Sequence, residues 1–313
     1  MIILHAGANP PTDGPLYTHW YLEPTVALLV VGLIAAYFVL TGPFNRRYPG
    51  WEARTITPKQ RNCFLGGCAA LLVALGPPLD DWSGYFLLSA HMLQHIILIM
   101  LVPPLLLLGI PAWGLEPLTR NPITNRIGYT LTRPLVAWVI GSLTMAVWHV
   151  PVLYDLALRN EAVHILEHQT YIITGLLVWW PIFGMLPAWP KPPPPLQCLY
   201  LFFTTIPGGV VGSVITMANP PIYEQYGIAT RMWGLGVQTD QEIAGLMMWV
   251  GENTLYLLLI TVIFLRWANA EERKDRVRPE VPVSASSPSS PPNPPVEANG
   301  HGRGGVPAVG EGA

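Results

Sequence analysis

The chain has 313 residues, of which 51% are hydrophobic and only 12% are charged, and its mean hydropathy is +0.37. A soluble domain carries about a quarter charged residues, so this composition indicates a membrane protein. The net charge of −2 argues against nucleic-acid binding, because it provides no basic surface for phosphates.

Two features of the chain are assigned ordinary roles. The first six residues are too short and too poor in basic side chains for a cleavable signal peptide. The three cysteines, Cys63, Cys68 and Cys198, form no Cys-x-x-Cys pair, and we interpret them as small apolar residues.

Seven apolar stretches approach or reach the roughly 20 residues that a transmembrane helix needs. The second and the fourth are short unless they include flanking residues. In chain order the stretches are 25–41, 62–76, 85–109, 135–150, 162–184, 196–217 and 243–267. The predicted fold is therefore an all-α, polytopic bundle of seven transmembrane helices.

The basic residues predict the orientation of this bundle, because Lys and Arg concentrate in short cytoplasmic loops. With the N-terminus outside, fifteen of the seventeen basic residues lie inside, and only Arg159 and Arg231 lie outside. We therefore expect an extracytoplasmic segment at 1–21 and a transmembrane domain at 22–267. Residues 268–313 are rich in Pro, Ser and Gly, which predicts a disordered cytoplasmic tail.

Five of the eight histidines are predicted to lie at one depth near the outer face. His91 and His95 begin the third span, His149 ends the fourth, and His164 and His168 begin the fifth. Residues four apart share a helix face, so two pairs and one single imidazole can meet. One isolated histidine is better explained by a hydrogen bond to the backbone, but five at one depth favour a metal site.

The identity of the metal is less well defined by these residues. Imidazole suits zinc, copper, iron and nickel, whereas thioether sulfur favours Cu(I). Met145 lies one turn before His149, and Met92 and Met217 also fall in the outer half of the bundle. Each methionine alone is better explained as apolar filler, so the sequence favours copper by a small margin.

Several carboxylates are placed to support such a site. Glu167 adjoins His168, and Asp240 and Glu242 precede the seventh span. Metal-bound histidine usually donates its second N–H to such a group, although a solvated rim explains Asp240 and Glu242 equally well. Glu252 lies near the middle of the seventh span, where a carboxyl must be protonated, paired or hydrated. A proton or metal path and a structural hydrogen bond both fit Glu252.

Four motifs in a fixed order resemble one protein family. They are His91-Met-Leu-Gln-His95 followed by Pro103-Pro104 and Gly109-Ile-Pro111, Trp148-His149-Val-Pro151, His164-Ile-Leu-Glu-His168 with Trp179-Trp180-Pro181, and Asp240-Gln241-Glu242 before Ala244-Gly245. Together, over residues 20–267, they resemble the CtaG family of polytopic bacterial cytochrome c oxidase assembly factors.

This resemblance implies about seven spans in the bacterial plasma membrane and a role in forming active haem–copper oxidase through copper delivery. The implied partners are cytochrome c oxidase subunits and another copper chaperone. The matching positions are His91, His95, His149, His164, His168, Asp240 and Gln241. Members more usually carry a second Gln where this chain has Glu242.

Other functions fit parts of the same pattern. The order His164-x-x-Glu167-His168 matches that of inverted zinc proteases, in which the glutamate is the general base. Histidines on facing helices can also bind haem b at both axial positions, or join helices without a metal. We expect a copper-binding assembly factor that is not an enzyme.

Overall fold

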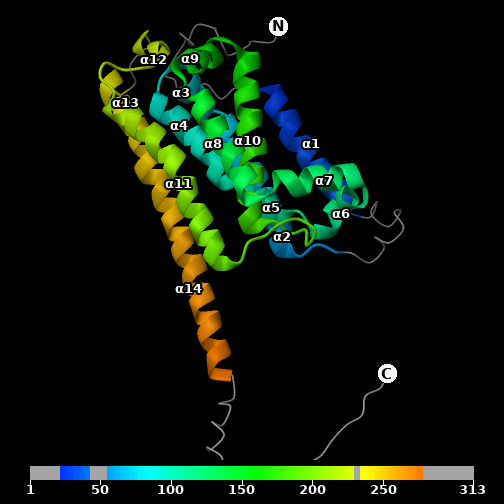
Figure 1. The fold of residues 1–313 in the computed structure, drawn as a ribbon. Coiled ribbons are helices and arrows are strands. Elements are labelled where there is room, and N and C mark those ends of the chain that lie inside the picture. The colour runs from blue at the N-terminus through cyan, green and yellow to red at the C-terminus, as the bar shows by residue number, and fades with distance from the viewer. Residues whose placement is uncertain (1–21, 43–54, 229–232, 278–313) are drawn as a thin grey trace, which may run out of the picture. The chain divides into compact units, whose positions relative to one another are not determined.

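The structure is a computed structural model that describes residues 22–42, 55–228 and 233–277. These residues are helical and form no strand (Figure 1). Residues up to Ala270 belong to one compact unit, and those from Glu271 onward belong to a second. The predicted segment 1–21 and most of the predicted tail, from residue 278 onward, lie outside the described residues.

The helices fall into two groups, those in or near the predicted spans and those that connect them. The helices that lie in or near the predicted spans are α1 (Pro24–Thr41), α2 (Pro58–Leu75), α4 (Leu88–Ile96), η3 (Ile97–Leu101), α5 (Val102–Gly109), α8 (Pro134–Trp148), α10 (Glu161–Phe183), α11 (Pro194–Met217), α13 (Val237–Leu246), η4 (Met247–Glu252) and α14 (Asn253–Val277). The connecting helices are α3 (Leu79–Tyr85), α6 (Ala112–Arg120), α7 (Pro122–Leu131), α9 (Pro151–Arg159) and α12 (Glu224–Ile228).

Helix starts follow from local sequence. Proline occupies the first turn of α1, α2, α7, α8, α9 and α11, where its missing N–H costs no hydrogen bond. Before α2, Thr57 and Gln60 form a reciprocal capping box, in which Thr57 Oγ1 accepts from the Gln60 backbone N–H at 3.2 Å. Asn160 caps α10 by accepting a hydrogen bond from Val163 N at 3.3 Å.

Helices occupy all seven of the predicted spans, but they do not all meet the criteria for crossing a membrane. By length and composition, five stretches qualify: Pro24–Thr41, Pro58–Tyr85, Leu88–Gly109, Pro194–Met217 and Val237–Lys274. A sixth qualifies if α7 and α8, which meet at a 69° bend, form one span. Helix α10 has 23 residues, but two glutamates and two histidines in its first two turns reduce its apolar character. The chain is therefore a multi-pass membrane protein with five or six such spans among the described residues.

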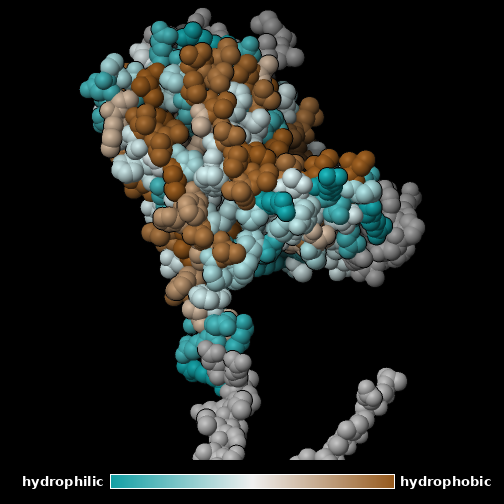
Figure 2. All heavy atoms as spheres, viewed as in Figure 1, coloured by the Kyte–Doolittle hydropathy of each residue, from teal (hydrophilic) through white to brown (hydrophobic). Residues whose placement is uncertain are grey.

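Apolar side chains on the outside of the long helices agree with a lipid environment. Figure 2 shows hydrophobic residues along the sides of the bundle, and hydrophilic residues near α9 and α12 and on α6 and α7. Leu28 on α1 and Leu135 on α8 are 72% and 71% exposed. Patches of this extent are rare on soluble monomers and are expected where lipid covers the surface.

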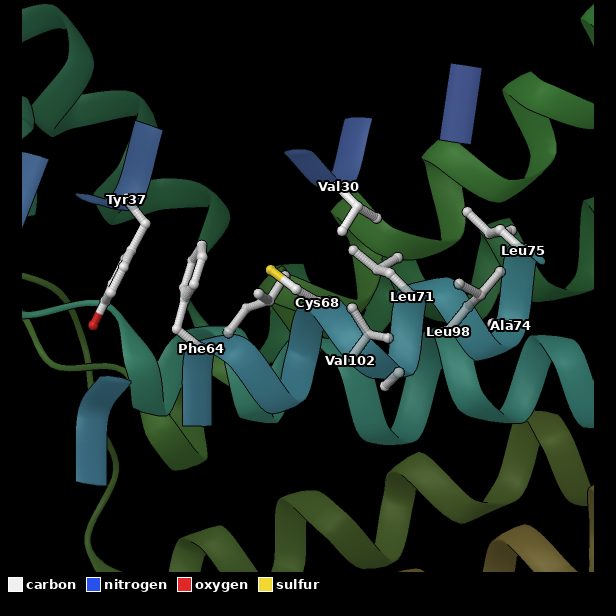
Figure 3. Close-up of a cluster of buried hydrophobic side chains, with 11 residues drawn as sticks. Val30, Tyr37, Phe64, Cys68, Leu71, Ala74, Leu75, Leu98 and Val102 are labelled. Carbon is white, nitrogen blue, oxygen red and sulfur yellow. The ribbon is translucent and has the colours of Figure 1, made fainter. Parts of the chain in front are cut away.

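A hydrophobic cluster joins α1, α2, η3 and α5 (Figure 3). The rings of Tyr37 and Phe64 stack with centroids 3.9 Å apart, and the Tyr37 hydroxyl donates to the Gly109 carbonyl at 3.1 Å. A side-chain carbon at Gly109 would lie 2.5 Å from the Phe64 backbone nitrogen, so only glycine permits this approach. Cys68 lies inside the cluster, in agreement with its interpretation as an apolar residue.

Two segments of π-helix interrupt the predicted third and seventh spans. The carbonyl of Ile99 in η3 receives no hydrogen bond from the residue four positions later, because that residue is Pro103 and has no N–H. Trp179 on α10 donates its indole N–H to that carbonyl at 2.7 Å and so satisfies it. The second π segment, η4, contains Met248 and Glu252. Such segments are uncommon and occur frequently at functional sites.

Candidate metal centre

The structure brings the five predicted histidines together at the end of the bundle that carries α9 (Figure 1). His91 is central, with its ring centroid 4.3 Å from that of His95, 5.5 Å from that of His164 and 6.2 Å from that of His168. The His149 ring lies 6.2 Å from the His95 ring. Two i,i+4 pairs and one single imidazole therefore share one level, as the spacing predicts.

Asp240 fixes the start of the helix that carries His91 and His95. The residue before α4, Leu87, has no side chain that can cap the helix. Asp240 on α13 replaces that cap: its carboxylate accepts from the backbone N–H groups of Leu88 at 2.8 Å and Ser89 at 3.1 Å. It also accepts from the Ser89 hydroxyl at 2.6 Å. These contacts make Asp240 a positioning residue for α4, and none of them is with an imidazole.

The tautomer of His91 follows from its tyrosine neighbours. The Tyr226 hydroxyl donates its single proton to the Ser83 carbonyl at 2.5 Å, so its oxygen is an acceptor for His91 Nδ1 at 2.9 Å. The Tyr154 oxygen lies 2.8 Å from the same nitrogen. His91 Nδ1 therefore carries the ring proton, and the lone pair of Nε2 is left for another partner.

His149 has the same protonation pattern for a different reason. Its Nδ1 lies 2.8 Å from the Met145 carbonyl, which can only accept, so the proton is on Nδ1. Its Nε2 is buried without a hydrogen-bond partner in the described part of the chain, as is Nε2 of His168. Buried polar atoms are rarely left unpaired, and a bound cation would satisfy both of these nitrogens.

Two sets of side chains hold their ligand atoms within 4.8 Å of one another. The first is His91, His95 and His168, and the second is His91, His164 and Glu167. Nε2 of His91 lies 2.9 Å from Nε2 of His95, which in turn lies 3.6 Å from Glu167 Oε1. Two nitrogens bound at 2.0–2.1 Å to a tetrahedral ion lie about 3.3 Å apart, so small side-chain rotations suffice to admit one. The donor set therefore fits a late first-row metal ion.

A cavity of about 180 Å³ reaches this cluster from the side. His164 and His168 line its wall together with three acidic residues, Glu23, Asp80 and Glu161. An acidic lining attracts cations, which gives the cluster an electrostatically favourable approach.

The predicted supporting residues have different positions. Glu167 is 0% exposed, and its carboxylate lies close enough to His91 and His164 to be a metal ligand itself. Glu242 accepts from Gln238 on its own helix at 3.2 Å. Glu252 and Met145 line a small cavity beside His95 and His149. Met217 is 75% exposed at the end of α11 and lines neither of these two cavities.

Sequence reasoning missed the tyrosines around the cluster. Tyr171 follows His164 and His168 at i+7 and i+3, so helical periodicity alone could have identified it. Its hydroxyl lies 3.3 Å from His149 Nδ1. Tyr226 belongs to the short helix α12, and no spacing in the sequence connects it to His91.

The chain is similar to one protein family and to several mycobacterial proteins. A family model described as "Cytochrome c oxidase caa3 assembly factor (Caa3_CtaG)" matches residues 35–270. Uncharacterized proteins of Mycobacterium bovis and Mycobacterium tuberculosis are each 24% identical over 282 residues, and one of Mycobacterium leprae is 22% identical. These alignments cover 85% of this chain but 42% of each relative, so the chain spans less than half the length of the curated relatives it matches. No solved structure matches the chain.

Proposed function

We propose that this chain, which belongs to the cytochrome c oxidase caa3 assembly factor family, binds copper at the buried histidine cluster and delivers it to an oxidase subunit. Copper is the cargo in this proposal, and the protein is not an enzyme. The observation that carries the proposal is the convergence of His91, His95 and His168 with their ligand nitrogens within 4.8 Å of one another.

The proposed topology has seven crossings with the N-terminus outside and the C-terminus in the cytoplasm. Counted this way, α8 and α10 are also spans, and the histidine cluster lies in the outer leaflet of the bacterial plasma membrane. The distribution of basic residues along the sequence supports this orientation, because fifteen of the seventeen fall in segments that this topology assigns to the cytoplasm. Metal binding then offsets the free-energy cost of burying ionisable groups in the membrane.

The geometry of the cluster favours metal-ion binding over the two alternatives, haem binding and zinc-dependent proteolysis. Nε2 of His91 lies 2.9 Å from Nε2 of His95, which leaves no room for a haem macrocycle between these two rings. In a zinc protease Glu167 would face a water-accessible substrate cleft, but it is 0% exposed and lies 3.6 Å from His95. A role as metal ligand or proton acceptor suits Glu167 better than that of general base.

The function is tested by complementation. In a bacterium that carries this chain, deletion of its gene should lower oxidase activity and the copper content of the isolated oxidase. The wild-type chain should restore both, whereas a variant with His91→Ala and His168→Ala, inserted at equal abundance, should restore neither. Full rescue by this variant would contradict the proposal. His301→Ala, in the predicted tail, provides the matched control and should rescue fully.

A further inference from the structure

A second group of metal-binding side chains lies directly beside the histidine cluster. Met92 on α4, Met145 on α8 and Met248 on η4 line one small cavity of about 10 Å³, and His95 and His149 complete its polar wall with Glu252. His95 therefore belongs both to the histidine cluster and to the wall of this cavity. The space is of the size that one water molecule or ion occupies.

The three methionines come from three different helices and converge deep inside the protein. Met92 is 0% exposed and Met248 is 3% exposed. These two residues belong to one hydrophobic cluster, and Met145 packs against it. Methionine is common apolar filler, so burial alone does not distinguish a site. The polar groups that line the cavity do distinguish it, because methionines that only fill apolar space need no imidazole or carboxyl group beside them.

His149 provides the independent indication of a ligand. Its side chain is 93% buried, because its exposed fraction is 7%. Its Nδ1 proton is committed to the Met145 carbonyl, which leaves the Nε2 lone pair in the interior without a hydrogen-bond partner among the described residues. His149 is also absent from both sets of ligand atoms that converge within 4.8 Å in the histidine cluster. A cation in the adjoining cavity would satisfy this nitrogen.

Local backbone features bring Met145 and Glu252 to the same place. Glu252 lies four residues after Met248 in η4, so both side chains reach the cavity from one helix face. A side-chain carbon at Gly208 on α11 would lie 3.3 Å from Glu252 Oε2 and 3.4 Å from Met145 Cε. Glycine at position 208 thus leaves room for the side chains of Met145 and Glu252 against α11.

We propose that Met92, Met145, Met248 and His149 form a second, soft site that binds Cu(I). Thioether sulfur selects the cuprous ion, whereas these ligands are poor for hard divalent cations. Neutral methionines and an imidazole leave the bound ion with a charge of +1, and the 94% buried Glu252 carboxylate can balance it. This inference rests on the proposed function and adds that the cargo occupies two adjacent positions, one rich in nitrogen and one rich in sulfur.

The test uses the full chain, purified in detergent under anaerobic, reducing conditions and titrated with Cu(I) against a chromophoric Cu(I) chelator. X-ray absorption at one and two equivalents reports the ligand atoms. We expect two bound equivalents, with sulfur in the copper shell. Met92→Leu with Met248→Leu, which conserves side-chain volume, should lose one equivalent and the sulfur signal. Met217→Leu, at an exposed methionine, should retain both.

Each outcome separates this inference from the proposed function. Copper bound by nitrogen alone in the wild-type chain, or unchanged sulfur in the double variant, would overturn the soft site and leave the histidine site intact. No Cu(I) bound at all would overturn both. If the double variant fails to fold, as judged by size-exclusion elution, Met145→Leu provides the milder substitution. It should lower Cu(I) affinity by at least roughly tenfold, as even outer-shell changes do.

Discussion

The Nε2 atoms of His91 and His95 lie 2.9 Å apart in the interior of the protein. At this distance the two nitrogens can share one proton, but they cannot each carry one. Because His91 holds its ring proton on Nδ1, the shared proton belongs to His95, and Glu167 lies 3.6 Å away as an acceptor. Metal binding should therefore displace a proton from this pair.

Glu167 is predicted to serve the metal and not a hydrolytic reaction. Glu167→Gln keeps the shape of the side chain but removes its charge, so metal affinity should fall by roughly 10–100-fold, the range seen when groups around a metal are altered. Competition titration with a metal chelator measures this affinity. A metal affinity equal to that of the wild-type chain, accompanied by loss of a measurable proteolytic activity, would contradict this role.

Asp240 is predicted to act on the cluster through α4. Asp240→Ala leaves the buried N–H groups of Leu88 and Ser89 without their acceptor, which should cost roughly 1–3 kcal/mol of stability. Thermal unfolding in detergent measures this loss, and metal titration should show weaker binding. Glu242→Gln is the control and should leave both quantities nearly unchanged, because the hydrogen bond that Glu242 makes among the described residues is to Gln238 on its own helix.

Tyr226 is predicted to set the tautomer of His91. Tyr226→Phe removes the hydroxyl that only accepts from His91 Nδ1, and the remaining Tyr154 hydroxyl can donate to this nitrogen, so the ring proton can move to Nε2 and compete with the metal. Metal affinity should fall by about 10–100-fold. Competition titration with a chelator measures the change, and Tyr129→Phe, at an exposed tyrosine on α7, is the control. Equal affinities for the two variants would show that the tyrosine has no such role.

A glycine contact is predicted to hold α13 against α11. A side-chain carbon at Gly245 would lie 2.7 Å from the Gly212 carbonyl oxygen, so Gly245→Ala should force the helices apart and destabilise the protein by about 1–3 kcal/mol. Gly251→Ala, where nothing lies within 4 Å, should be neutral or slightly stabilising. Thermal unfolding compares the two. Equal unfolding temperatures would contradict the close packing.

Much of the helical framework follows from sequence. Apolar length locates each long helix, and the prolines at 58 and 134 extend the second and begin the fourth stretch, which the apolar pattern leaves short. The common depth of His91, His149 and His164 follows from counting residues from helix ends. The number of crossings is less predictable, because the polar groups of α10 weaken the apolar signal in a helix of 23 residues.

The surroundings of the site were harder to predict, because they depend on contacts between distant segments. The sequence predicts that Asp240 supports a metal-bound histidine or lies on a solvated rim, yet its carboxylate accepts from Ser89, 151 residues away in sequence, and caps α4. Met248 joins Met92 and Met145 only because three helices pack at one point, and periodicity within one helix does not reveal such a meeting. The structure thus shows which contacts the residues named in the sequence analysis make, and adds Tyr154, Tyr171 and Tyr226 around the cluster.

The most direct test is the metal content of the purified full chain, measured by mass spectrometry after incubation with copper and removal of free ions. The account predicts bound copper in the wild-type chain and in His301→Ala, and loss of the copper held by the histidine cluster, but not of copper held by the methionine site, from the variant that combines His91→Ala with His95→Ala. Equal copper in the wild-type chain and the double variant would contradict the assignment of the histidine cluster as the metal centre.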